Sequence, residues 1–589
     1  MKFPYQNKKK LLAVAMGQQP ADLAVHNVKV FNVFTGELQE AVVYVSDNAI
    51  AHIERKDLEV SEKLAKKVYD GQGGIVIPGY IDTHIHIEST MMTPRNFAKW
   101  AVLYGTTTVI SDPHELANVV GIRGVEYMHE AAEGLPMRQL INIPSCVPSV
   151  PGLEEAGASF GVEEVEKLSK LERVVGLAEV MDFIGVVNGE ARMMDIIAAS
   201  EKAGLFLQGH APSVSGRMLS AYLCGGPKSD HETWPSEEAK EKMRAGLYVD
   251  ARESSIARNV KAIWEGVKDF RYHDTLCFCT DDREAADVVS QGEMNNAVKV
   301  AVEAGMHPLD AIRCATFNNA REYHFENLGA LAPGYIADFQ ILESLEDFKP
   351  KAVFFEGRLV AENGKLTAPI LERSYPLEKE NTMKIKDLKV SDFIIDTPVK
   401  NGTVTINAMV YQSYEDVMTR VSPITVEVKD GRIILPPDTN FVAVVNRHGH
   451  YDNIALNLVQ GFGSSGGTIA STVSHDSHNL TIVYDTPENA LLAANTLKDC
   501  GGGLATIANG KVLALLPLPL CGLISLLPGE EIAKQVEAIR DANFSLGMTM
   551  FDNPVMRIMT LALIVIPMVK MSDKGLIDVY NKKVIELFA

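Results

Sequence analysis

Cysteine is scarce in this chain, which has seven in 589 residues. No two of them form a Cys-x-x-Cys pair, and an odd number cannot pair completely within one chain. The cysteines therefore do not have the pattern of a disulfide framework. We therefore expect a protein of the reducing cytoplasm, with any metal held by histidine and carboxylate rather than by thiolate.

Long uninterrupted apolar runs are also missing. Lys8, Lys9 and Lys10 precede an apolar run at 11–16, but six residues are too few for the core of a secretion signal. Of two later apolar stretches, 512–527 contains Pro517 and Pro519, and 558–569 is too short to cross a bilayer. We expect a first helix at 11–16, buried segments in the later stretches, and no membrane partner.

Positive charge is in deficit, because 56 Lys and Arg stand against 76 Asp and Glu, a formal net charge of −20. Such a chain is poorly suited to bind a phosphate backbone, so no nucleic-acid partner is expected. Hydrophobic residues make up 46% and charged residues 22%, which is the balance of a folded protein with large cores.

The pattern along the chain predicts an α/β protein. Residues 21–79 alternate with the period of β-strands, and 80–320 alternate short β-rich runs with helical stretches such as 236–245 and 297–304. About eight such units would close a (β/α)8 barrel. Strand character returns at 326–366, which we expect to complete a small β-sandwich begun before the barrel.

Five segments follow from this reading. We predict an N-terminal helix and part of the split β-domain at 1–76, the catalytic barrel at 77–325, the remainder of the β-domain at 326–370, a proline-containing linker at 371–400, and a C-terminal α+β domain at 401–589. The glycine-rich segment at 461–467 lacks the ending of a P-loop and is predicted to be a structural turn.

The strongest local motif is IDTHIHIEST at 81–90. Alternate residues of a strand point the same way, so His84 and His86 share a face and can bind one metal ion. Glu88 follows on the same face. Two incidental strand histidines are the structural alternative for an isolated His-x-His.

Other candidate ligands end later β-rich runs. They are Glu179, His210, His231, Asp281 and Asp282. Each alone is more often an ordinary buried polar residue. Because they follow successive strands of one predicted barrel, they would converge at one end of it. Such a set suits zinc, manganese or iron, and two cations would need a bridging anion, which Glu179 could supply.

These motifs resemble a known superfamily. PGYIDTHIHIES, the strand-end residues and LAPGYIADFQIL resemble the amidohydrolase superfamily. More narrowly, DPHELANVVG, SDHE, TDD and ASTVSHDSHN are similar to the bacterial adenine deaminases, from about residue 20 to the end of the chain.

The resemblance implies a binuclear metal centre, with manganese or iron favoured over zinc. His84 and His86 would bind one ion and His210 and His231 the other, with Glu179 as the bridge. Asp281 would bind the first ion and exchange protons with the bridging water.

By the same resemblance, a metal-bound hydroxide would attack C6 of adenine in purine salvage, releasing hypoxanthine and ammonia. Catalytic roles fall to Asp281, Glu179 and Glu88. The candidate substrate-binding or outer-shell residues are His114, Glu115, Arg252, Glu253, Asp282, His475 and His478.

Two segments depart from the family pattern. The chain reads RESS at 252–255, where the family has Gly-Ser after Arg-Glu, and GEMNN at 292–296, where it has a Gly-His-Ile-Asp-like string. Four alternatives therefore stay open: an N6-substituted adenine, another aminated heterocycle, a cyclic amide as in dihydropyrimidinases, and an inactive relative serving as a scaffold.

The C-terminal cluster His475, Asp476, His478 and Asn479 has two interpretations of equal weight. It is either a loop that reaches the barrel to contact substrate, with a third metal site as a weaker variant, or a turn bonded within its own domain. We also expect a homo-oligomer, with a dimer favoured, on general grounds.

Overall fold

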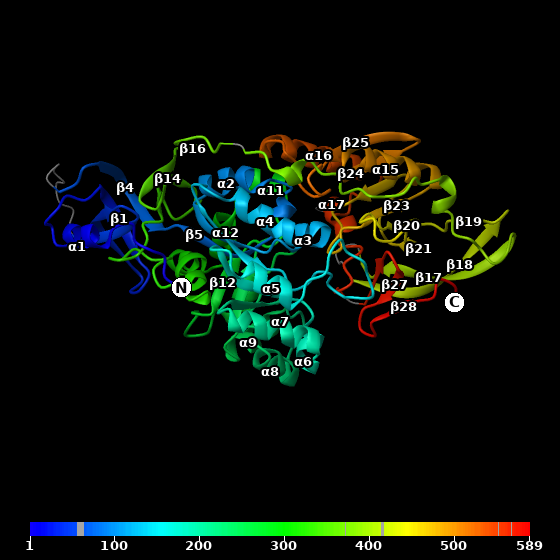
Figure 1. The fold of residues 1–589 in the computed structure, drawn as a ribbon, viewed down its shortest axis with the longest axis horizontal. Helices are drawn as coiled ribbons and strands as arrows, with labels where there is room; N and C mark the ends of the chain where they lie inside the picture. Colours follow the sequence, from blue (N-terminus) through cyan, green and yellow to red (C-terminus); the bar gives the residue numbers. More distant parts are fainter. Residues whose placement is uncertain (56–63, 372, 414–417, 552, 567) are drawn as a thin grey trace.

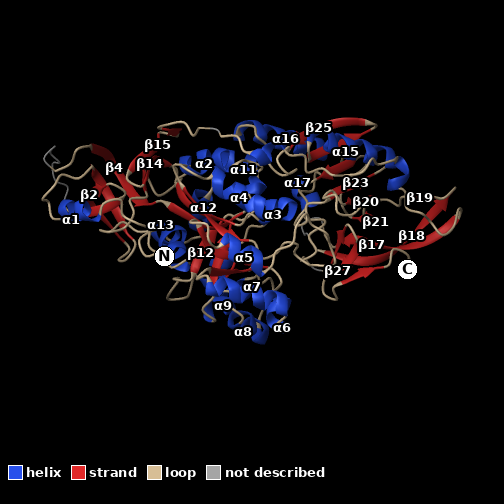
Figure 2. Cartoon of the chain, in the orientation of Figure 1, coloured by secondary structure: helices blue, strands red, loops and turns tan. Residues whose placement is uncertain are grey.

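The computed structural model describes residues 1–55, 64–371, 373–413, 418–551, 553–566 and 568–589. The chain forms three groups of elements along its longest axis (Figure 1). A sheet of early and middle strands lies at one end, parallel strands wrapped by helices lie in the middle, and the C-terminal elements lie at the other end. Helices and strands lie together in the middle and C-terminal groups (Figure 2).

The middle group holds the strands predicted for the barrel. One parallel sheet has five strands in chain order: β5 (Tyr80–Ile85), β6 (Thr106–Ser111), β7 (Arg138–Ile143), β8 (Val174–Val180) and β9 (Phe206–Gly209). A second has three: β10 (Ser229–Asp230), β11 (Tyr248–Arg252) and β12 (Leu276–Cys279). The predicted α/β pattern is confirmed for this region.

The predicted closed barrel needs correction, because the eight strands do not form one continuous sheet. At one junction Lys228 N donates to Leu207 O (2.9 Å), and at the other Asp281 N donates to His84 O (2.9 Å). β10 has two residues, too few for a ladder with β9. The two sheets therefore meet edge to edge through isolated hydrogen bonds.

Helices cover these sheets because their apolar residues recur at helical spacing. In α12 (Met294–Glu303) the buried residues include Met294, Ala297, Val298 and Ala301. The other long helices of this region are α2 (Pro94–Leu103), α4 (Ile122–Ala131), α7 (Ala191–Lys202), α8 (Gly216–Cys224), α9 (Ser236–Arg244) and α10 (Val260–Val267). Of the helices that the structure describes, none has the length and apolarity required to cross a membrane.

Strands from both sides of the middle group join one eight-stranded sheet, in the order β16-β15-β14-β13-β4-β1-β2-β3. Its strands are β1 (Leu23–Asn32), β2 (Glu37–Ser46), β3 (Ala49–Glu54), β4 (Val68–Pro78), β13 (Phe339–Leu342), β14 (Pro350–Phe355), β15 (Arg358–Glu362) and β16 (Lys365–Leu366). β13 pairs antiparallel with β4, placing Gln340 opposite Ile77. The expected union of the early and late strands is therefore present. The helix predicted at 11–16 is present within α1 (Lys8–Ala15).

The C-terminal elements mix strands and helices. A nine-stranded sheet runs β19-β18-β17-β21-β20-β23-β22-β24-β25, with a separate three-stranded sheet. The strands of the nine-stranded sheet are β17 (Gly402–Tyr411), β18 (Thr419–Lys429), β19 (Arg432–Ile434), β20 (Thr439–Val445), β21 (Ile454–Gln460), β22 (Thr468–Ser471), β23 (Leu480–Tyr484), β24 (Gly503–Ala508) and β25 (Lys511–Pro517). The long helices are α15 (Pro487–Cys500) and α16 (Gly529–Ser545). The loop between β22 and β23 carries the histidine cluster.

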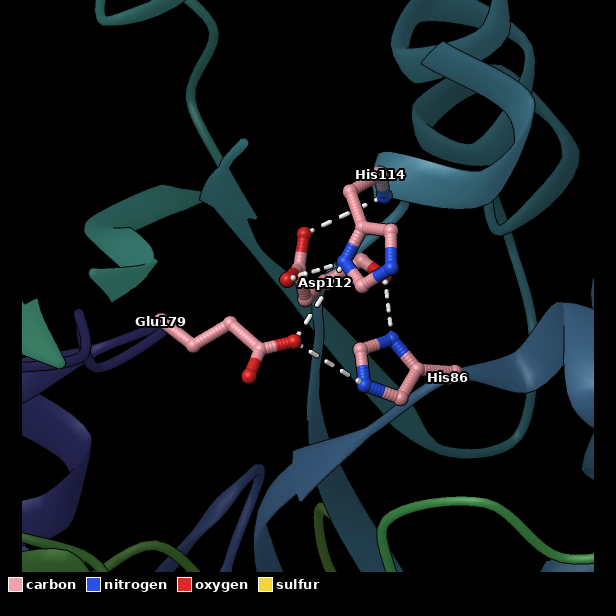
Figure 3. Close-up of side chains that lie close together, drawn as sticks. All are labelled: His86, Asp112, His114 and Glu179. Carbon is pink, nitrogen blue, oxygen red and sulfur yellow. Dashed lines mark hydrogen bonds and ion pairs between the residues drawn. The ribbon is translucent and has the colours of Figure 1, made fainter. Parts of the chain in front are cut away.

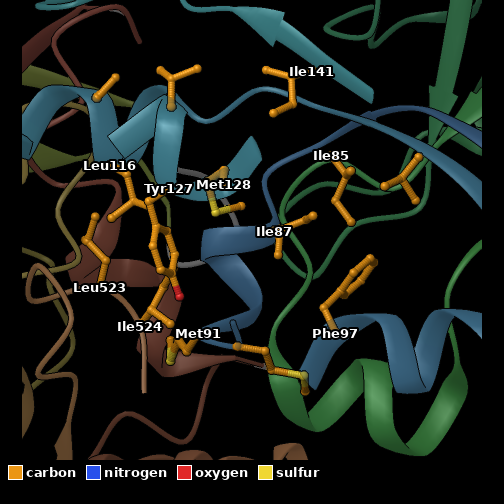
Figure 4. Packing of buried hydrophobic residues seen from close by; sticks show 14 of the residues in the cluster. Ile85, Ile87, Met91, Phe97, Leu116, Tyr127, Met128, Ile141, Leu523 and Ile524 are labelled. Atoms are coloured by element: carbon orange, nitrogen blue, oxygen red, sulfur yellow. The ribbon is translucent and has the colours of Figure 1, made fainter. Parts of the chain in front are cut away.

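The middle and C-terminal groups share a hydrophobic core (Figure 4). Leu523 and Ile524, from the C-terminal group, belong to the same buried cluster as Leu116 and Tyr127. Ser525 N also donates to Met91 O (2.9 Å). This common core holds the β22–β23 loop against the ends of the barrel strands.

Candidate metal centre

The two histidines of the His-x-His motif lie where β5 ends. His84 is within the strand and His86 follows it, and both side chains are buried. Asp281 follows β12 with a left-handed backbone (φ 56°), and its carbonyl accepts from His86 N (3.3 Å). This turn directs Asp281 Oδ1 to within 3.4 Å of His84 Nε2 and 3.3 Å of His86 Nε2.

Glu179, at the end of β8, lies between two sets of histidines. Its Oε1 is 3.4 Å from His86 Nε2 and 3.4 Å from His114 Nδ1 (Figure 3). Its Oε2 is 2.6 Å from His210 Nδ1 and 3.1 Å from His231 Nε2. The two oxygens thus face different ligand sets, which is the geometry that a bridging carboxylate requires.

The donor atoms form compact buried groups. Three groups surround the carboxylates of Glu179 and Asp281: His84 with His231 and Asp281; Glu179 with His210 and His231; and His86 with Asp112, His114 and Glu179. The second matches a predicted ligand pair. The predicted pair of His84 and His86 meets at Asp281, whose Oδ1 lies 3.4 and 3.3 Å from their Nε2 atoms. The ring of His84 also stacks on that of His231, with centroids 4.0 Å apart.

These residues fit a divalent transition metal. Donors bound to one ion at about 2.1 Å lie roughly 3.0–3.4 Å apart, which is the separation between Asp281 Oδ1 and both His84 and His86. His84 Nε2 is buried and, among the described residues, has no hydrogen-bond partner. A buried unpaired ring nitrogen is costly, and a cation would satisfy it.

The electrostatics follow from burial and the mixture of charges. Burial, with the charge of His231, lowers the pKa of His84 to about 4. Burial opposes protonation of His231, but its contact with Glu179 raises the pKa to about 9. Burial also opposes ionisation of Glu179, yet the neighbouring His210 holds its pKa well below the ordinary value. His84 thus remains neutral, which is the form that binds a cation.

Three residues outside the predicted set, Gln208, Asp112 and Glu232, orient residues of this site. Gln208 Oε1 lies 3.0 Å from His84 Nδ1, and Asp112 O lies 3.1 Å from His86 Nδ1. Such contacts fix the ring orientation of metal-binding histidines. Glu232 pairs with Arg252 through two bonds of 2.5 and 3.0 Å. Asp112 Oδ2 also lies 2.8 Å from His114 Nδ1.

Period-two spacing could have identified Gln208, which precedes His210 by two residues in the same strand direction. The sequence offers no comparable indication that Glu232 would meet Arg252, because that contact joins the loop after β10 to the end of β11.

The predicted Arg252 lies beside Asp281, with Nη1 2.6 Å from Asp281 Oδ2. Glu253, although adjacent, points elsewhere: its carboxylate is 3.7 Å from Arg258, and its carbonyl accepts from Arg283 (2.8 Å). The structure therefore does not bring the Glu253 side chain into the histidine groups.

The remaining predicted residues lie beside the histidine groups. Together they form what we call the second wall, which consists of Glu88, Glu115, Asp282, His475 and His478. Glu88 lies in η1 (Ile87–Thr90), and burial, reinforced by the charge of Glu115, raises the pKa of Glu88 to about 8. Asp282 Oδ1 accepts from Ser89 Oγ (2.6 Å), which also donates to Glu115 (3.2 Å). The wall is thus a buried carboxylate cluster next to the histidines.

The C-terminal loop completes this wall. Glu115, in α3 (His114–Val120), has Oε2 2.9 Å from His478 Nε2 and Oε1 3.3 Å from His475 Nδ1. The loop therefore reaches the barrel region, as one of the two interpretations requires, and its contact with substrate stays a prediction. Hydrogen bonds within the loop also exist, such as Ser474 N to His478 Nδ1 (3.2 Å).

Buried histidines and carboxylates at the carboxyl ends of parallel strands define a metal-dependent hydrolase of the amidohydrolase type, and the amidohydrolase family matches residues 75–360. The adenine deaminase C-terminal domain matches residues 416–583. The chain belongs to the adenine deaminase family, since curated members align with nearly its whole length.

Three of these relatives illustrate the similarity. An adenine deaminase of Kosmotoga olearia is 38% identical over 98% of this chain and 98% of its own. Adenine deaminase 2 of Carboxydothermus hydrogenoformans is 39% identical over 98% and 99%. The adenine deaminase of Staphylothermus marinus is 36% identical over 98% and 97%. The resemblance expected from the motifs is confirmed.

Proposed function

We propose that the protein hydrolyses adenine to hypoxanthine and ammonia, as the names of its full-length relatives indicate for them. One structural observation carries the hydrolytic part of this proposal: the two oxygens of Glu179 face separate sets of histidines. A carboxylate in that position can serve two cations at once, which a single-metal or purely structural site does not need.

The proposed ligands of two divalent ions, manganese or iron in preference to zinc, are His84, His86, Glu179, His210, His231 and Asp281. When bound, such ions lower the pKa of water enough to supply hydroxide at neutral pH.

The chain's own residues would position and move protons. Arg252 holds Asp281 Oδ2, so Asp281 Oδ1 is left directed at the histidines. We assign Asp281 as the base that takes a proton from the attacking water and returns it to the departing amino group. Glu88 is the proposed donor to the purine ring, because it lies in the turn directly after His86.

Binding of the purine is assigned to Glu115, Asp282, His475 and His478, which line the second wall. His114, Arg252 and Glu253 are proposed as supporting groups rather than substrate contacts, since their side chains already pair with Asp112, Asp281 and Arg258.

One of the two departures from the family pattern supports adenine over a modified base. Glu293, in the GEMNN segment, accepts from Thr106 Oγ1 (2.5 Å) and Thr280 Oγ1 (3.1 Å). The Glu293 side chain therefore links β6 to the residue that follows β12. A substitution at this position alters the scaffold and leaves the second wall intact.

We further propose that the five segments predicted from the sequence are the structural divisions of the chain. A cytoplasmic location is supported by the cysteines, all seven of which are free. A homo-oligomer remains part of the proposal.

The test is ammonia release from the metal-loaded enzyme with adenine, N6-methyladenine, guanine, cytosine and a hydantoin. We expect turnover of adenine above all the others. N6-methyladenine would release methylamine in place of ammonia, so turnover of that base is measured by the formation of hypoxanthine. No product from any aminopurine would refute the proposal, and opening of the hydantoin would favour the cyclic-amide alternative.

A further inference from the structure

A further donor group lies at the contact between the barrel region and the C-terminal loop. It consists of His114 from α3, Cys146 from the loop after β7, and Asp476 from the loop between β22 and β23. All three are buried, and one ligand atom from each lies within 4.8 Å of the others. Three distant segments therefore bring a nitrogen, a sulfur and an oxygen donor to one point.

The orientation of His114 supports a ligand role. Its Nδ1 lies 2.8 Å from Asp112 Oδ2, on the side of the ring that faces Asp112 and Glu179 (Figure 3). Its Nε2 is 3.7 Å from Asp476 Oδ1 and, within the described part of the chain, makes no hydrogen bond. A carboxylate on one ring nitrogen and a free lone pair on the other is the usual arrangement of a metal-binding histidine.

Negative charge gathers on the other side of this group. Asp476 Oδ2 and Glu154 Oε2 are both buried, and neither has a hydrogen-bond partner among the described residues. His475 Nδ1 lies 4.0 Å from Asp476 Oδ1, which is too far for a hydrogen bond. A bound cation would therefore relieve the repulsion between Asp476 and Glu154.

We propose that His114 Nε2, Cys146 Sγ and Asp476 Oδ1 bind one divalent transition-metal ion, distinct from the catalytic ions, that fastens the C-terminal loop to the barrel. Mixed nitrogen, sulfur and oxygen ligands suit zinc. Coordination would deprotonate the thiol. His114 Nε2 and Asp476 Oδ1 need to approach by only a few tenths of an ångström, from 3.7 Å to the roughly 3.4 Å of a tetrahedral site.

Cobalt(II) provides a specific test, because a thiolate ligand gives a charge-transfer band in the near ultraviolet that histidine and carboxylate do not. The proposed catalytic ligands include no sulfur. Metal-free protein titrated with Co²⁺ is therefore expected to develop this band, and C146S is expected to lose it together with one bound cobalt per chain. C314S is the matched control, because Cys314 is also a buried free thiol.

Two further variants keep the test decisive. D476N retains the thiol and should weaken the site roughly 10-fold or more, while E179Q should deplete catalytic metal and keep the band. Absence of the band in wild-type protein saturated with cobalt, or its persistence in C146S, would overturn the proposal. Because the readout is a spectrum, a negative result would overturn the proposed metal site without bearing on the proposed deamination.

Discussion

At the residue scale, the site depends on a few side chains whose positions follow from strand geometry. His84 and His86 were predictable because a strand alternates its faces, and Glu179 because it ends a β-rich run. The partners that orient them were less accessible to sequence reasoning. Asp112 contributes its backbone carbonyl to His86, a contact that no spacing rule predicts. Its carboxylate contacts His114 only two residues further on, a local spacing typical of aspartate.

The substitution E179Q tests the residue on which the proposed centre depends. Glutamine keeps the shape but removes the charge that faces both sets of histidines, so we expect depletion of metal and loss of at least roughly 100-fold in ammonia release. Mutation of a residue that only hydrogen-bonds to a metal ligand typically lowers metal affinity or activity by roughly 10–100-fold. Metal analysis and the ammonia assay measure both effects.

E172Q is the control, because Glu172 is an exposed carboxylate just before the same strand. Full activity and full metal content in E179Q would contradict the bridging role.

At the element scale, loops and short helices bring the second wall together. α3 supplies Glu115, and the β22–β23 loop supplies His475 and His478. α1 performs a different task, since Lys10 pairs with Asp22 (2.5 Å) and Asp47 (2.7 Å) and so ties the helix to the split sheet. Each of these contacts joins elements whose order in the chain gives no indication that they meet.

The Asp22 contact makes the stability of the split sheet depend on pH. Burial opposes ionisation of Asp22, but hydrogen bonds from Lys10 and Lys66 lower its pKa from 3.8 to about 2. A lowered folded-state pKa stabilises the protein above pH 3.8, and that contribution disappears as the pH falls toward 2.

D22N should therefore be less stable than wild type near neutral pH, by about 1 kcal/mol because the site is partly exposed. The difference should shrink below pH 4. Urea denaturation across this pH range measures it, with E40Q, an exposed carboxylate of β2, as the control. An undiminished difference at the lowest pH would contradict the linkage.

At the scale of the whole molecule, the middle and C-terminal groups are joined by a continuous apolar core. Leu523 and Ile524 pack in the cluster that also holds Leu116 and Tyr127, both from helices beside the metal centre (Figure 4). The C-terminal group is thus part of the folding unit that positions the site, which explains how a distant loop reaches Glu115.

L523A tests this connection. Leu523 is buried, and its truncation should cost about 2–5 kcal/mol because a cavity is left in the shared core. We expect unfolding of both groups at a lower denaturant concentration in a single transition, whereas L526A, at a leucine 45% exposed, should change little. Tryptophan fluorescence reports on the middle group, because Trp100, Trp234 and Trp264 all lie there. Far-ultraviolet circular dichroism follows the whole chain.

Separation into two transitions, with only the C-terminal one shifted, would contradict the shared core.

The sequence by itself determined the α/β pattern, the strand-end ligands and the family, because each depends on local periodicity or on contiguous motifs. Only the tertiary structure decided which histidines share a donor group, that Glu253 turns away, that β10 is too short to close the sheet ladder, and that His114, Cys146 and Asp476 meet. The physical reason is that these features depend on contacts between residues far apart in the chain, and packing of the shared core fixes those contacts.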